Sequence, residues 1–112
     1  MTDKAEISLL LDYYGAFLTE RQRELMRMSA DEDMSLSEIA DLVGVSRQGV
    51  RDCLNRATAQ LKELESGLGL IYHDRKLRGI AEMLEAALDQ TSEGGAKDAM
   101  RKALDEIRSV IR

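Results

Sequence analysis

The sequence predicts an all-α protein built around a helix-turn-helix, with a C-terminal helical extension. The 112-residue chain contains no proline, only 4% aromatic residues and 44% hydrophobic residues, and Ala, Leu, Met, Glu, Arg and Lys give it helical preference almost throughout. Apolar residues also recur at spacings of three and four. Because this length suits one small domain with an extension, we expect a helix-turn-helix domain over residues 1–70 and an extension over residues 71–112.

The first two helices are predicted from their caps. Asp3 or Thr2 can cap a helix that ends near Gly15. Thr19-Glu20-Arg21-Gln22 has the form of a capping box, so a second helix should run from about Glu20 to about Ala30. The apolar side chains that we expect the first helix and its C-terminal end to place in the core are Ile7, Leu10, Leu11, Tyr13, Tyr14 and Phe17.

Residues 36–54 have the pattern of a helix-turn-helix. Such a motif needs a small residue where its helices cross, a residue that tolerates positive φ in the turn, and buried apolar side chains that fix the crossing angle. Ala40 and Gly44 meet the first two requirements, while Ser35 and Ser46 cap the two helices. The apolar set comprises Ile39, Val43, Val45, Val50 and Cys53.

The helix after Ser46, with no strong stop signal before Gly67 and Gly69, begins with the only clearly basic stretch. Residues 46–62 carry four basic and one acidic side chain, although the whole chain has a net charge of −5. If this helix enters a major groove, its arginines can contact phosphates or guanine and its amides can contact adenine. The other interpretation is a solvated polar helix face. The predicted nucleic-acid-binding residues are Ser46, Arg47, Gln48, Arg51, Asp52, Asn55 and Arg56.

Two further amphipathic helices are expected after residue 71. The first runs from about Tyr72 to about Gln90, with apolar positions at Leu77, Ile80, Leu84 and Leu88. Residues 91–95 form a linker, and the last helix carries a stripe of Met100, Leu104, Ile107 and Ile111, widened by Ala103 and Val110. Such a stripe must fold back on the preceding helix or meet a second chain. We expect a homodimer whose interface includes residues from Leu77 onward.

The sequence offers little support for catalysis, metal binding or membrane insertion. It lacks a glycine-rich phosphate loop and a nucleophile paired with a base, so an enzyme is not expected. A single Cys53, predicted to be buried, and a single His73, predicted to be on the surface, provide no metal-ligand set, and no cofactor is expected. The longest aliphatic run is Leu9–Leu11, so we expect no signal peptide or membrane span and a cytoplasmic protein.

Two sets of motifs resemble known proteins. LTERQREL at residues 18–25, SLSEIA at residues 35–40 and GVSRQ at residues 44–48 resemble region 4 of sigma-70 factors, a helix-turn-helix module that reads promoter DNA. LLDYYG at residues 10–15, NRA at residues 55–57 and GLGL at residues 67–70 are similar to the YlxM family of small bacterial proteins. The resemblance covers roughly residues 5–72, and departs from the family at Met28–Ala30 and at Gly49.

The resemblance implies a short all-helical bundle and two alternative functions. YlxM proteins are generally encoded beside the signal recognition particle GTPase and are proposed regulators of that pathway. The first function is a DNA-binding regulator that uses the helix after Ser46, and the basic stretch favours it. The alternative is a module that binds the RNA or the GTPase of the signal recognition particle without sequence-specific DNA binding. The net charge of −5 favours this alternative.

Overall fold

The computed structural model describes residues 3–111, which fold into two compact units, the first ending at Gly69 and the second beginning at Leu70. Every regular element in this part of the chain is a helix, which confirms the predicted all-α class. Unit 1 contains α1 (Lys4–Tyr14), η1 (Gly15–Phe17), α2 (Glu20–Ala30), α3 (Leu36–Val43) and α4 (Arg47–Leu68). Unit 2 contains α5 (Leu70–Asp89) and α6 (Gly95–Val110).

The helices of unit 1 begin where the local sequence supplies partners for their free N–H groups. At α1, the Asp3 carboxylate accepts a hydrogen bond from the Ala5 N–H at 3.3 Å. At α2, the Thr19 hydroxyl accepts the Gln22 N–H at 3.2 Å, and the Gln22 side chain accepts the Thr19 N–H at 3.0 Å. These bonds satisfy donors that have no partner within a helix.

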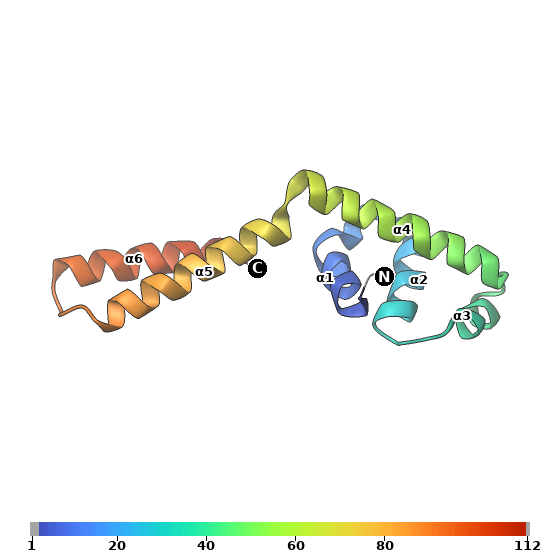
Figure 1. Cartoon of the computed structure of the whole chain (residues 1–112), viewed down its shortest axis with the longest axis horizontal. Helices are drawn as coiled ribbons and strands as arrows, with labels where there is room; N and C mark the ends of the chain where they lie inside the picture. The colour runs from blue at the N-terminus through green and yellow to red at the C-terminus, as the bar shows by residue number, and fades with distance from the viewer. Residues whose placement is uncertain (1–2, 112) are drawn as a thin grey trace. The chain divides into compact units, whose positions relative to one another are not determined.

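The longest helix of unit 1, α4, is the one against which the others pack. Figure 1 shows α1, α2 and α3 along one side of it. Its inward residues Val50, Ala57 and Leu61 are fully buried, at spacings of seven and four residues. Tyr14 of α1 is also fully buried, and its hydroxyl donates to the Glu65 carboxylate at 2.5 Å. The polar end of this core side chain therefore keeps a partner after burial.

Two side chains that the sequence pattern assigned to the core of unit 1 are exposed. Val45 is 44% exposed because it lies in the turn between α3 and α4, while Ile39 and Val50 fill the space between the helices. Phe17 is 58% exposed. It belongs to the 3₁₀-helix η1, whose three residues per turn break the α-helical spacing from which its burial was predicted.

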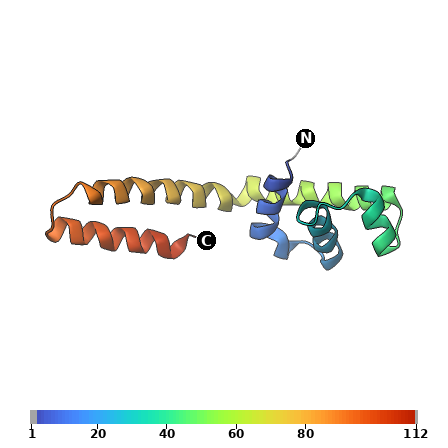
Figure 2. The same ribbon diagram turned by 90° about the horizontal axis from the view of Figure 1, so that it is seen from below.

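In unit 2, α6 folds back antiparallel beside α5, as both views show (Figures 1 and 2). Ala81, Leu88 and Leu104 form the buried cluster between the two helices. Leu84, Met100 and Ile107 pack against this cluster and remain half-buried. The stripe predicted on the last helix is therefore covered, at least along one edge, by the helix before it.

Three apolar positions of the expected stripes in unit 2 are exposed. Ile80 is 47% exposed, and the neighbouring Ala81 takes the buried position instead. The residues that face α6 are Ala81, Leu84 and Leu88, and Ile80 lies about 100° round the helix from Ala81. On α6, Ala103 is exposed and Val110 is 64% exposed.

Candidate nucleic-acid interface

The turn between α3 and α4 has the local structure that the motif requires. Gly44 ends α3 in the left-handed conformation, with φ 74° and ψ 32°, and its N–H donates to the Ala40 carbonyl at 2.9 Å. Ser46 then caps α4, because its hydroxyl accepts the Gly49 N–H at 3.0 Å. Only residues 44–46 separate the two helices, so the chain reverses within the length typical of a helix-turn-helix.

The crossing of α3 and α4 is fixed by a small apolar core that also includes α2. Ala40, 7% exposed, lies in one cluster with Leu25, Ile39 and Val50. Half-buried side chains surround this cluster, among them Cys53. Burial raises the pKa of the Cys53 thiol above its ordinary value. A thiol of raised pKa is a poor nucleophile at neutral pH, which fits a packing role for this residue.

All seven predicted contact residues are exposed, on the part of α4 that follows the turn. A helix turns by about 100° per residue. This rotation brings Arg47, Gln48, Arg51, Asp52 and Asn55 to adjoining positions on one side. Arg56 lies about 140° farther round than Arg51. Five of the seven residues therefore form one main face, Arg56 is a flanking cation, and Ser46 is the N-cap of the helix.

The polar groups of the main face differ in how freely they can meet a ligand. The Gln48 amide donates to the Asp52 carboxylate at 2.9 Å, so these two side chains hold one another one turn apart. Among residues 3–111, by contrast, Arg47 and Arg51 have no hydrogen bond or ion pair. Their guanidinium donors remain available for phosphate or base acceptors.

Sequence reasoning missed one cation near Cys53. Arg21, exposed near the start of α2, lies close enough to Cys53 that it and Arg56 both act to lower the pKa of the thiol, although burial outweighs them. Arg21 and Arg56 therefore both lie near Cys53. The motif at residues 18–25 marked Arg21 only as part of a helix start, and the contact depends on how α2 packs against α4.

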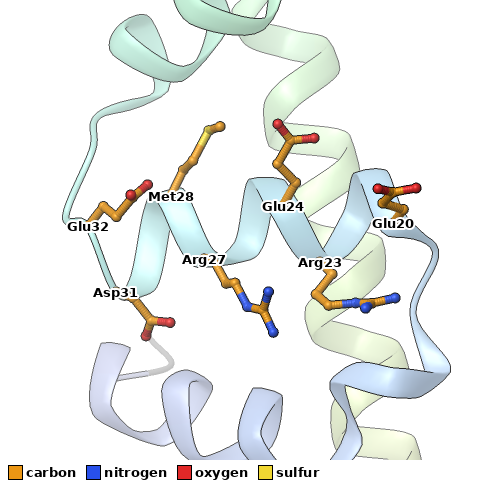
Figure 3. A pocket seen from close by; sticks show the side chains of 7 residues that line it. All are labelled: Glu20, Arg23, Glu24, Arg27, Met28, Asp31 and Glu32. Atoms are coloured by element: carbon orange, nitrogen blue, oxygen red, sulfur yellow. The ribbon is translucent and has the colours of Figure 1, made fainter.

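A surface hollow of about 550 Å³ lies elsewhere, along α2 and the turn that follows it. In Figure 3, Glu24 and Met28 point to one side of α2, whereas Arg23 and Arg27 point to the other. Acidic and basic side chains alternate along it at spacings of three and four. Its lining residues are Glu20, Arg23, Glu24, Arg27, Met28, Asp31 and Glu32. This arrangement is typical of a solvated helix face.

Neither a metal-ligand group nor a membrane-spanning helix is found in the part of the chain that the structure describes. Within residues 3–111, no group of three or more His, Cys, Asp and Glu side chains could hold a metal ion. His73 is exposed and lies edge-on to the Tyr72 ring, with 5.4 Å between the ring centroids. None of the helices in the described part of the chain is both long enough and apolar enough to cross a membrane.

Comparison with known proteins identifies close relatives along nearly the whole chain. Residues 1–101 match the UPF0122 family, described as "Putative helix-turn-helix protein, YlxM / p13 like". A UPF0122 protein of Symbiobacterium thermophilum is 48% identical over 110 residues, which cover 97% of this chain and 98% of the relative. One of Clostridium botulinum is 42% identical over 93 residues, covering 82% and 85%. One of a Thermoanaerobacter species is 36% identical over 105 residues, covering 94% and 90%.

Proposed function

Since the chain belongs to the UPF0122 family of YlxM/p13-like helix-turn-helix proteins, which is not a family of known enzymes, we propose that it is a regulatory protein that binds duplex DNA through α4. One observation carries this proposal. The second helix of the motif presents Arg47 and Arg51, exposed and without an ion pair among residues 3–111, near the start of the basic stretch over residues 46–62 of an acidic chain. Phosphate attraction would concentrate there.

Each exposed group has a role that its chemistry suits. Arg47 and Arg51, one turn apart, reach either phosphates or the O6 and N7 acceptors of guanine. Asn55, one further turn along, suits the N6 and N7 groups of adenine. The bond from Gln48 to Asp52 leaves a Gln48 carbonyl and one N–H for a base edge. Arg56 flanks this face and attracts the phosphate backbone.

The charge of the remaining chain limits how the DNA can lie. Residues 1–69 carry eight basic and thirteen acidic side chains, so most of unit 1 repels phosphate. We therefore expect contact only along the exposed face of α4, and a salt slope of about −3 if Arg47, Arg51 and Arg56 each neutralise one phosphate. So small a footprint favours a homodimer, in which two recognition helices lie one duplex turn apart.

A second candidate function is supported by the same acidic balance. A module of the signal recognition particle system would bind the particle's GTPase or RNA and keep the helix-turn-helix as a scaffold. The acidic and basic side chains along α2, around the hollow in Figure 3, suit a polar protein partner better than a nucleic acid. Regulation of the signal recognition particle pathway is compatible with either function.

The decisive experiment compares binding partners and variants side by side. Fluorescence anisotropy would measure binding to random-sequence duplexes of about three helical turns, to the particle's RNA and to its GTPase, over a range of salt. The test variant replaces Arg47, Arg51 and Arg56 with alanine. The matched control replaces Arg75, Lys76 and Lys102, exposed cations of unit 2, and changes the net charge equally.

We expect the wild type to bind duplex DNA, the test variant to lose affinity and most of the salt slope, and the control to keep both. Equal affinity and slope in the test variant and the wild type would contradict DNA binding through α4. Binding to the RNA or the GTPase without binding to duplex DNA would favour the second candidate.

A further inference from the structure

One face of the α5–α6 hairpin is apolar and exposed, with the exposed Glu106 of α6 at its margin. The cluster between the helices has three buried residues, Ala81, Leu88 and Leu104. The residues directly before them are all apolar: Ile80, Ala87 and Ala103. The residues directly after them are all acidic: Glu82, Asp89 and Asp105. The hairpin is therefore divided into an apolar and a charged side.

An ion pair shows how these two sides are arranged in space. Glu85 and Arg108 each lie four residues after a buried residue, which places them about 40° beyond it, and their side chains pair at 2.8 Å. Because the helices are antiparallel, the residues that follow the buried residues on α5 lie on the same face of the hairpin as those that follow the buried residues on α6. The residues that directly precede the buried residues lie about 100° round each helix in the other direction. On both helices they therefore lie on the opposite face of the hairpin.

We call this opposite surface the hairpin apolar face. Met83 is 74% exposed, Val110 64% and Ile80 47%, and the alanines between them are exposed as well. Half-buried Leu84 and Met100 lie beneath. The members of the face are Ile80, Met83 and Ala87 of α5 and Ala99, Ala103 and Val110 of α6. Exposed apolar surface of this extent on a small unit usually marks an interaction site.

The size of unit 2 indicates that this face needs a cover. The unit spans only residues 70–112, and its core cluster has three fully buried side chains. Segments of about 40 residues rarely hold a core without oligomerisation, a metal or disulfides. The hairpin apolar face extends along α6 from Ala99 to Val110, about 16 Å at about 1.5 Å per residue, so two helices about 10 Å apart present roughly 300 Å² of it in projection. This area suits a small interface of the weak kind, which buries less than about 1,200 Å² of accessible surface in total.

We propose that a second copy of this chain covers the hairpin apolar face, so that two hairpins form a four-helix bundle around a two-fold axis. The face complements itself, because α5 contributes the large side chains Ile80 and Met83, whereas α6 contributes the small Ala99 and Ala103. A two-fold axis can set the ridge of each α5 over the alanines of the partner's α6. Four-helix bundles bury both hairpins' inner stripes in this way. The proposal depends on unit 2 alone and holds whether or not α4 binds DNA.

The test is the mass of the full chain in solution, measured by sedimentation equilibrium without nucleic acid. We expect a dimer at tens of micromolar. Replacing Met83 and Val110 with lysine should weaken dimerisation at least tenfold, because each change buries a charge in the bundle. The matched control adds the same charge at Ala86 and Ser109, which are exposed and lie about 120° round their helices from Ile80 and Ala103 of the hairpin apolar face, and should remain dimeric.

Several results would overturn the proposal. A wild-type protein that is monomeric at 100 micromolar would overturn the proposal without any variant, because the hairpin apolar face would then not be covered by a second copy of this chain. A dimer of unchanged strength in the Met83 and Val110 variant, with helical content retained by circular dichroism, would place the interface elsewhere. Equal weakening in the control would show that added charge alone, rather than its position, controls association.

Discussion

Replacing Gly44 with valine tests the turn of the helix-turn-helix through its backbone alone. Gly44 has φ 74°, and a Cβ added there would meet no atom within 4 Å, so no side-chain clash contributes. Left-handed backbone costs a non-glycine residue about 1–2 kcal/mol, and a β-branched residue more, so we expect a loss of about 2 kcal/mol. At about 4–8 °C per kcal/mol for a domain of this size, thermal unfolding of unit 1 should shift down by about 8–16 °C.

Two controls separate backbone conformation from other effects. Asparagine tolerates the left-handed region, so Gly44→Asn should retain most of the stability lost in Gly44→Val. Gly67, within α4, also has open space around an added Cβ but no positive φ, so Gly67→Ala should stabilise by up to about 1 kcal/mol. The measurement is thermal unfolding followed by circular dichroism. The left-handed turn would be refuted if Gly44→Val unfolds at the same temperature as the wild type, or if Gly44→Asn is no more stable than Gly44→Val.

Three other residues give predictions that can be checked on the same protein. Ala40→Leu should destabilise by about 1–3 kcal/mol in urea titrations because it overfills the crossing of α3 and α4, whereas Ala59→Leu, on the exposed side of α4, should change little. Hydrogen bonds from Ser35 hold the pKa of Glu38 below its usual value. The folded pKa is then lower than the unfolded one, so the stabilisation is present above the unfolded pKa and is lost as pH falls through the folded pKa. Between about pH 6 and about pH 3 the wild type should therefore lose more stability than Glu38→Gln, and equal losses would argue against the capping box. Alkylation of Cys53 at about pH 8 should be several-fold slower in the folded protein than in urea, because burial raises the thiol pKa, and equal rates would contradict its burial.

The parts of the fold that could be predicted are those whose interactions close within a few residues. Both capping boxes form as the sequence indicated, since each joins a side chain to a backbone group three residues away. Gly44 ends α3 in the left-handed conformation for the same local reason. Residue identity decides these features before any distant packing occurs.

The features that the sequence did not reveal depend on contacts between distant segments. The sequence pattern allows either Ile80 or Ala81 to face α6, because both choices preserve helical spacing. The packing of α6 against α5 decides between these two neighbouring positions, and it buries Ala81. Arg21 lies beside Cys53 and Arg56 only because α2 packs on α4. The bond from Gln48 to Asp52 joins two residues that were both predicted to face a ligand. Their spacing of four allowed the bond but did not require it.

The width of the apolar stripe on α6 explains why the sequence supported two outcomes for this helix. One antiparallel partner covers a stripe about 100° wide. From Leu104 back to Ala99, however, the apolar surface extends over about 140°, and α5 covers the edge that contains Leu104 while Ala99 and Val110 stay exposed. Folding back on α5 therefore satisfies only part of the stripe. A second chain would cover the remainder of the stripe. Folding back on α5 and meeting a second chain would then be successive steps of burial rather than alternatives. The solution mass of the full chain measures whether the second step occurs.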